Sequence, residues 1–93
     1  MTPLITDHAR TRLHQRGIPL PVLDCLLDYG KKVHDHRGSE ILFFDHHARD
    51  QIHRTYDEHD FKQIEAKLDT YAVLGGDGSV VTVGHRTKRI NRN

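Results

Sequence analysis

Three side chains near the amino terminus have the types and spacing that suit phosphate chemistry. His8, Arg12 and Arg16 follow one another at four-residue steps. On a helix such steps place side chains about 6 Å apart along the axis, with about 40° of rotation between them, so the three would form one ridge. Guanidinium groups bind phosphate oxygens bidentately, and an imidazole that titrates near neutrality can accept or deliver a proton. We call His8, Arg12 and Arg16 the basic ridge; the alternative interpretation is solvated helix surface.

A second basic segment follows the last apolar run of the chain. Residues 80–83 are Val-Val-Thr-Val, which is typical of a core strand, and they lead directly into basic residues. Because a core strand holds its end firmly, a histidine and an arginine there could supply a second proton-transfer group and a further phosphate contact. The alternative is a basic tail that binds nucleic acid through phosphates without cutting it. The candidates are Thr82 or Thr87 to orient an oxygen, His85 and Arg86 as catalytic groups, and Lys88 and Arg89 as RNA contacts.

The composition predicts one small soluble domain over residues 1–93. Of these residues 35% are hydrophobic and 29% are charged. A chain of this length buries roughly 60–65% of the surface that it exposes when unfolded, which leaves nothing for a second core. No apolar run approaches the ~18 residues of a membrane-spanning helix, and no basic amino-terminal region leads into an apolar stretch. The one cysteine, Cys25, cannot form an internal disulfide, so we expect a buried thiol and a reducing, cytoplasmic location.

The formal net charge of +1 hides a gradient along the chain. Residues 48–70 carry more acidic than basic side chains, whereas residues 84–93 carry four basic side chains and no acidic one. The chain also has nine histidines, which gain positive charge in mild acid. The carboxyl-terminal end is therefore expected to attract anions.

Local patterns predict two helices before any strand. Thr6 is a suitable cap for a helix over residues 7–16, and Gly17 is a plausible stop. Two prolines then permit only a helix start, and a broad apolar face continues from there until Gly30 ends it. The basic ridge is then expected to border the face of the first helix that is buried against the core.

Two hairpins with helix between them are expected to complete the fold. Residues 31–35 and 40–44 predict the first hairpin; a two-residue loop at Gly38 and Ser39 would place Val33, Leu42 and Phe44 on one face and His34, His36, Ile41 and Phe43 on the other. Residues 48–68 fit one bent helix or two short ones. The second hairpin joins residues 71–74 to 79–83 through an Asp-Gly turn. The order is ααββαββ, an α+β fold with an antiparallel sheet of about four strands.

These residues together resemble a known group of proteins. The pattern His8-x-x-x-Arg12-x-x-x-Arg16-Gly17-Ile18, followed by a short helix, a hairpin and a terminal Val-Val-Thr-Val strand, is similar to uncharacterised small bacterial toxin-like domains. Those domains are grouped with the barnase–EndoU–colicin–RelE ribonucleases. The resemblance implies helices packed on an antiparallel sheet, and an RNA-cleaving site that needs no metal or cofactor and contains the basic ridge and Thr82.

That resemblance implies a specific reaction and a set of partners. A ribose 2′-hydroxyl would attack its own phosphate, with His8 as base, and the product would carry a cyclic phosphate. To the residues that the family implies we add His85 as acid, with Arg12, Arg16 and Arg86 stabilising the charge on phosphorus. The expected partners are RNA or the ribosome, together with an antitoxin or immunity protein, and a homodimer is left open.

Two other functions compete with RNA cleavage. A module that binds RNA, a ribosome or a partner protein would use the same basic surface; its candidates for base stacking are Tyr29, Phe43 and Tyr56, because Phe44, Phe61 and Tyr71 are expected in the core. A metal-binding protein would instead use a histidine cluster, although adjacent histidines point apart on extended backbone. The cluster comprises His34, His36, Asp45, His46 and His47.

Overall fold

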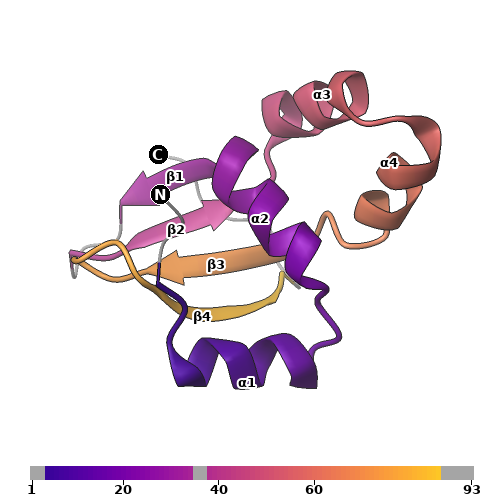
Figure 1. The fold of residues 1–93 in the computed structure, drawn as a ribbon. Coiled ribbons are helices and arrows are strands. Elements are labelled where there is room, and N and C mark those ends of the chain that lie inside the picture. The colour runs from indigo at the N-terminus through magenta and orange to yellow at the C-terminus, as the bar shows by residue number, and fades with distance from the viewer. Residues whose placement is uncertain (1–3, 35–37, 87–93) are drawn as a thin grey trace.

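A four-stranded antiparallel sheet carries the first two helices on one side in the computed structural model, which describes residues 4–34 and 38–86 (Figure 1). The α+β class predicted from the sequence is confirmed. Of the two alternatives for residues 48–68, the structure has two short helices. In chain order the elements are α1 (Asp7–Gln15), α2 (Leu20–Tyr29), β1 (Lys31–His34), β2 (Glu40–Phe43), α3 (His46–Thr55), α4 (Glu58–Glu65), β3 (Thr70–Leu74) and β4 (Val80–His85).

The first helix begins and ends where its local sequence predicts. The Thr6 hydroxyl accepts a hydrogen bond from the Ala9 amide at 3.2 Å, which satisfies one of the free amides of the first turn. At the other end Gly17 has a φ of +62°, a left-handed conformation that favours glycine. The Ile18 amide then donates to the Leu13 carbonyl at 2.9 Å and closes the helix.

The sheet has the strand order β1-β2-β3-β4, and the register of its first hairpin differs from the prediction. A two-residue loop at Gly38 and Ser39 would pair residue 37 with Glu40, but the structure pairs His34 with Glu40. This shift of three positions is odd, and an odd shift turns every side chain of one strand to the other face. Val33 therefore lies opposite Ile41 and away from Leu42, which corrects the expected grouping.

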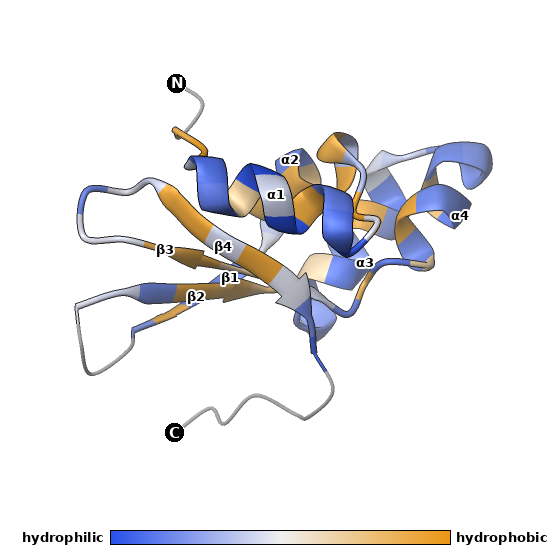
Figure 2. Ribbon diagram, turned by 90° about the horizontal axis from the view of Figure 1, so that it is seen from below, coloured by the Kyte–Doolittle hydropathy of each residue, from blue (hydrophilic) through white to orange (hydrophobic). Residues whose placement is uncertain are grey.

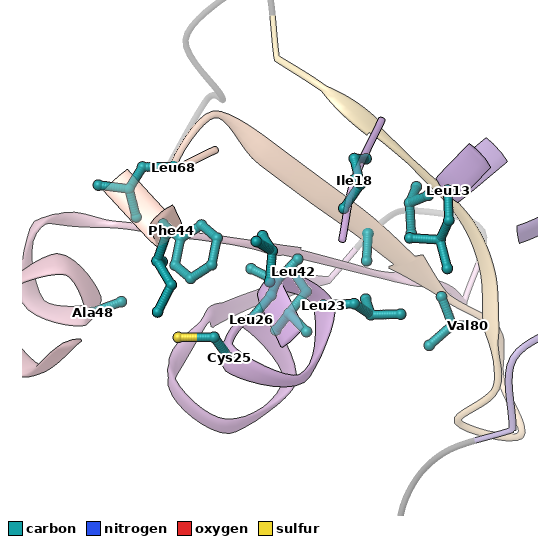
Figure 3. Close-up of a cluster of buried hydrophobic side chains, with 14 of the residues drawn as sticks. Leu13, Ile18, Leu23, Cys25, Leu26, Leu42, Phe44, Ala48, Leu68 and Val80 are labelled. Atoms are coloured by element: carbon teal, nitrogen blue, oxygen red, sulfur yellow. The ribbon is translucent and has the colours of Figure 1, made fainter. Parts of the chain in front are cut away.

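The hydrophobic core lies between α1, α2 and the sheet. Leu42, Ala72 and Val83 are cross-strand partners on β2, β3 and β4, and all three are buried. Leu23 and Leu26 of α2 pack in the same cluster, together with the Cys25 thiol, which is buried as expected (Figure 3). Replacing one such leucine with alanine would lower the free energy of unfolding by about 2–5 kcal/mol. The packing of helices on this face of the sheet therefore stabilises the fold.

Helices α1 and α2 pack on one face of the sheet. In Figure 2, α1 and α2 lie on the same side of the strands. Strand alternation turns Ile41, Phe43, Tyr71, Val73 and Thr82 to the opposite side. We call these five residues the open face. No helix of the part of the chain that the structure describes is long and apolar enough to cross a membrane.

The second hairpin has the predicted Asp-Gly turn. Gly78 has a φ of +86°, and the Gly75 amide donates to the Ser79 carbonyl at 2.8 Å. One carboxylate oxygen of Asp77 accepts from both the Ser79 hydroxyl at 2.7 Å and the Ser79 amide at 3.0 Å. These two hydrogen bonds lower the pKa of Asp77 below its ordinary value.

The lowered pKa predicts how pH affects this turn. The ionised Asp77 carboxylate contributes stability above the ordinary aspartate pKa of about 3.9, and this contribution is lost as the pH falls through the lower pKa of the folded protein. Asp77→Ala should therefore lower the free energy of unfolding at neutral pH and make little difference in strong acid. Urea unfolding of both proteins at several pH values checks this. A gap between them that does not change with pH would contradict the assigned role of the carboxylate.

Candidate functional site

Helix α1 lies along β4 and runs in the same direction as the strand (Figure 1). At the start of both elements the Thr6 amide donates to the Val80 carbonyl at 3.0 Å, and the Val80 amide donates to the Leu4 carbonyl at 2.8 Å. The Thr6 hydroxyl also donates to the Val81 carbonyl at 3.3 Å. At the far end, His85 Nε2 lies 2.9 Å from the carbonyl oxygen of Arg16. The helix is therefore attached to the strand at both ends.

His85 connects three segments of the chain. Its Nδ1 lies 3.1 Å from a carboxylate oxygen of Asp69, just before β3, while its Nε2 meets the Arg16 carbonyl just after α1. Both partners are hydrogen-bond acceptors, and a neutral imidazole has only one N–H to donate. The ring meets both partners as a donor only when it carries two protons. Asp69 is held a second time, because its backbone carbonyl accepts from the Arg86 amide at 2.7 Å.

The basic ridge faces outward along the edge of β4. Ala9 and Leu13 form the buried stripe of α1. On one flank of this stripe Arg10 and His14 line a shallow cavity with Leu20, so that flank faces α2. The basic ridge occupies the other flank of the stripe, as the helical repeat requires. Because β4 is the outer strand of the sheet, the ridge lies beside the sheet edge.

The three ridge residues differ in exposure and in their neighbours. Arg12 is half-buried, whereas His8 and Arg16 are exposed. Within the described residues, no carboxylate lies within ion-pair distance of either arginine, and the His8 ring makes no hydrogen bond. The ridge therefore presents positive charge and a titratable ring directly to solvent.

The two candidate proton-transfer histidines lie at opposite ends of α1. His8 belongs to the first turn, whereas His85 touches Arg16, the residue that ends the helix. Eight residues of helix correspond to a rise of about 12 Å. The structure thus brings Arg16 and His85 to one corner and leaves His8 at the other end of the ridge. For His85 to act as an acid, its Nε2 would first have to leave the Arg16 carbonyl.

The remaining predicted site residues lie elsewhere. Thr82 is opposite Val73 on the open face, so its side chain points away from α1. Arg86 follows β4, and its guanidinium carbon is 5.2 Å from the centre of the Phe43 ring, a cation–π distance. The predicted residues Thr87, Lys88 and Arg89 lie outside the described residues.

Two aromatic residues on the open face differ in burial from what the sequence predicted. Phe43, a candidate for base stacking, is fully buried, whereas Tyr71, expected in the core, is half-buried. Gly84 makes room for Tyr71, since a Cβ atom at Gly84 would lie 3.0 Å from the tyrosine ring. The available aromatic ring on this face therefore belongs to Tyr71.

Asp69 is a site residue that was not predicted from the sequence, because its partner His85 is 16 residues away in the chain.

The described side chains of the histidine cluster do not converge on one point where they could bind a metal ion. The Asp45 carboxylate caps α3 by accepting from the Ala48 amide at 2.8 Å, and the two histidines that follow lie exposed in the first turn. His34 pairs with Glu40 across the first hairpin at 3.9 Å, and His36 lies outside the described residues. Residues 4–34 and 38–86 contain no group of three or more His, Cys, Asp or Glu side chains that could hold a metal ion.

Comparison with known proteins leaves the site to be interpreted from its own geometry. No family model, curated protein or solved structure matches the chain. The arrangement of α1 and β4, and the charges that they carry, indicate what this surface can bind.

The two hydrogen bonds of His85 predict a cost for removing its ring. His85→Ala should lower the free energy of unfolding by about 1–3 kcal/mol, because the Asp69 carboxylate and the Arg16 carbonyl lose their shared donor. His34→Ala is the matched control, since it removes an exposed strand histidine with one long contact. Chemical denaturation measures the free energy of unfolding of both variants. Equal losses would show that His85 does not hold α1 to β4.

Proposed function

We propose that the protein binds RNA through phosphate contacts along the outer edge of β4. The observation that carries this proposal is the attachment of α1 to β4 at both ends, which turns the basic ridge outward beside the strand. Arg86 follows the end of the strand, with its guanidinium over the Phe43 ring on the open face. Asp69, the acidic residue at this corner, is engaged by His85. A basic strip whose two arginines, Arg12 and Arg16, have no carboxylate within ion-pair distance among the described residues suits a polyanion.

The chemistry of the strip supports a single strand of RNA as the ligand. The ridge is about 12 Å long, enough for more than one phosphate of a strand, and arginine binds phosphate bidentately. The half-buried ring of Tyr71 lies on the open face, where it could stack on a base. The resemblance of residues 8–18 to ribonuclease-like toxin domains supports RNA rather than DNA.

Removing the two arginines of the ridge tests this proposal. Arg12→Ala/Arg16→Ala should weaken binding to single-stranded RNA about tenfold and reduce the slope of log K against log salt by about 1.4, the loss expected for two phosphate contacts. The matched control is Arg49→Ala/Lys62→Ala, which removes the same charge from α3 and α4. Fluorescence anisotropy at several salt concentrations gives both quantities. Equal weakening by the control pair would mean that net charge, not the ridge, determines binding.

Metal-independent RNA cleavage is a second candidate function. The observation that favours it is the exposed His8 ring, which makes no hydrogen bond or ion pair among the described residues and lies on the same ridge as Arg12. His8 would take the proton of a 2′-hydroxyl, the 2′-oxygen would bond to phosphorus, and the bond from phosphorus to the 5′-oxygen would break. The leaving oxygen would receive its proton from water, because His85 lies at the other end of α1 and bonds to the Arg16 carbonyl.

Cleavage has its own test. RNA incubated with the protein in excess chelator should give products with a 2′,3′-cyclic phosphate, and DNA should stay intact because it lacks the 2′-hydroxyl. His8→Ala should reduce the rate at least a hundredfold, a typical loss for a general base. Product analysis by mass spectrometry checks both points. Undiminished cleavage by His8→Ala would remove the assigned role, whereas binding without any cleavage would leave the RNA-binding function alone.

A further inference from the structure

A cavity of about 420 Å³ lies between the start of α2 and the helix α4, away from the basic ridge. Figure 1 shows α4 and α1 on opposite sides of α2. The volume of the cavity is within the range of small-molecule sites, about 300–1,000 Å³. The residues that line it are Pro19, Pro21, Val22, Asp24, Tyr56, Asp60, Gln63 and Ile64.

The apolar part of the cavity wall is held in place by packing. Val22 and Ile64 are buried side chains that also belong to the hydrophobic core, so their positions are fixed by packing. Pro19 and Pro21 add two rings whose backbone φ angles are restricted. A flat apolar group would therefore meet a preformed surface rather than mobile loops.

Tyr56 supplies an aromatic, hydrogen-bonding group that is fixed from behind. Its ring lies edge-on to the Tyr29 ring, with 6.4 Å between the ring centroids. Burial raises the pKa of Tyr56 to about 12, so the hydroxyl stays neutral at physiological pH. The ring face can attract a cation, and the neutral hydroxyl can still accept a hydrogen bond.

The charges around the cavity have one sign. Asp24 of α2 and Asp60 of α4 are exposed carboxylates, and none of the described residues that line the cavity is basic. This contrasts with the edge of β4, where the charge is positive. A ligand that fills the apolar volume and leaves a positive group between the two carboxylates would match both features.

We infer that this cavity binds a small apolar amine, a flat apolar group that carries an ammonium on a short linker. The apolar group lies against Val22 and Ile64, and the ammonium meets Asp24 and Asp60 beside the Tyr56 ring. This inference does not depend on RNA binding, because the cavity shares no residue with the basic ridge.

Phenethylamine is a suitable probe, and titration followed by protein NMR provides the measurement. The expected result is a set of saturable amide shifts in residues 19–24 and 56–64. Phenylacetate, which has the same ring and the opposite charge, should cause no saturable shift in the same residues. Equal binding of the two probes would overturn the inference, since it would show that the carboxylates do not select the charge.

Paired variants test the carboxylates directly. Asp24→Asn/Asp60→Asn should weaken phenethylamine binding about tenfold, which is 1.4 kcal/mol. Asp28→Asn/Glu58→Gln is the matched control, because it removes the same charge from the same two helices at positions that do not line the cavity. The control pair should bind like the wild type. Unchanged affinity in the Asp24/Asp60 pair, or equal loss in both pairs, would overturn the inference.

Discussion

The arrangement of the candidate site depends on one constraint, the attachment of α1 to β4 at both ends. Thr6 bonds to the start of the strand, and His85 bonds to the carbonyl of Arg16 at its end. Between these points Ala9 and Leu13 bury one stripe of the helix. With two ends and one face held, the helix cannot rotate without losing hydrogen bonds or core contacts. The outward position of the basic ridge follows from that constraint.

The attachment of α1 to β4 also changes the role that we assign to His85. At a strand end, beside an arginine, this histidine has the position expected of a catalytic acid. In the fold its two ring nitrogens face the Asp69 carboxylate and the Arg16 carbonyl, so it holds the helix and engages an acidic group that would otherwise weaken the basic strip. The geometry therefore supports phosphate binding more directly than it supports a pair of histidines acting on one phosphate. In the cleavage reaction that we propose as the second candidate, His8 is the first group to act.

Local features of the fold could be predicted from the sequence, whereas features set by distant residues could not. The Thr6 cap, the stop at Gly17 and the Asp-Gly turn each depend on a few neighbouring residues, and all three are confirmed. The first hairpin was wrong in register because one odd shift in pairing reverses the faces of a strand. The partners of His85 were missed because Arg16 is 69 residues away in the chain.

The most direct test of the account is an NMR titration of the protein with single-stranded RNA at low salt. The account predicts that the largest amide shifts fall in residues 8–16 and 84–86, along α1 and the end of β4. It also predicts little change in α3 and α4, which lie on the far side of α2 (Figure 1). Shifts that centre on α3 and α4 and leave α1 unchanged would contradict the central claim.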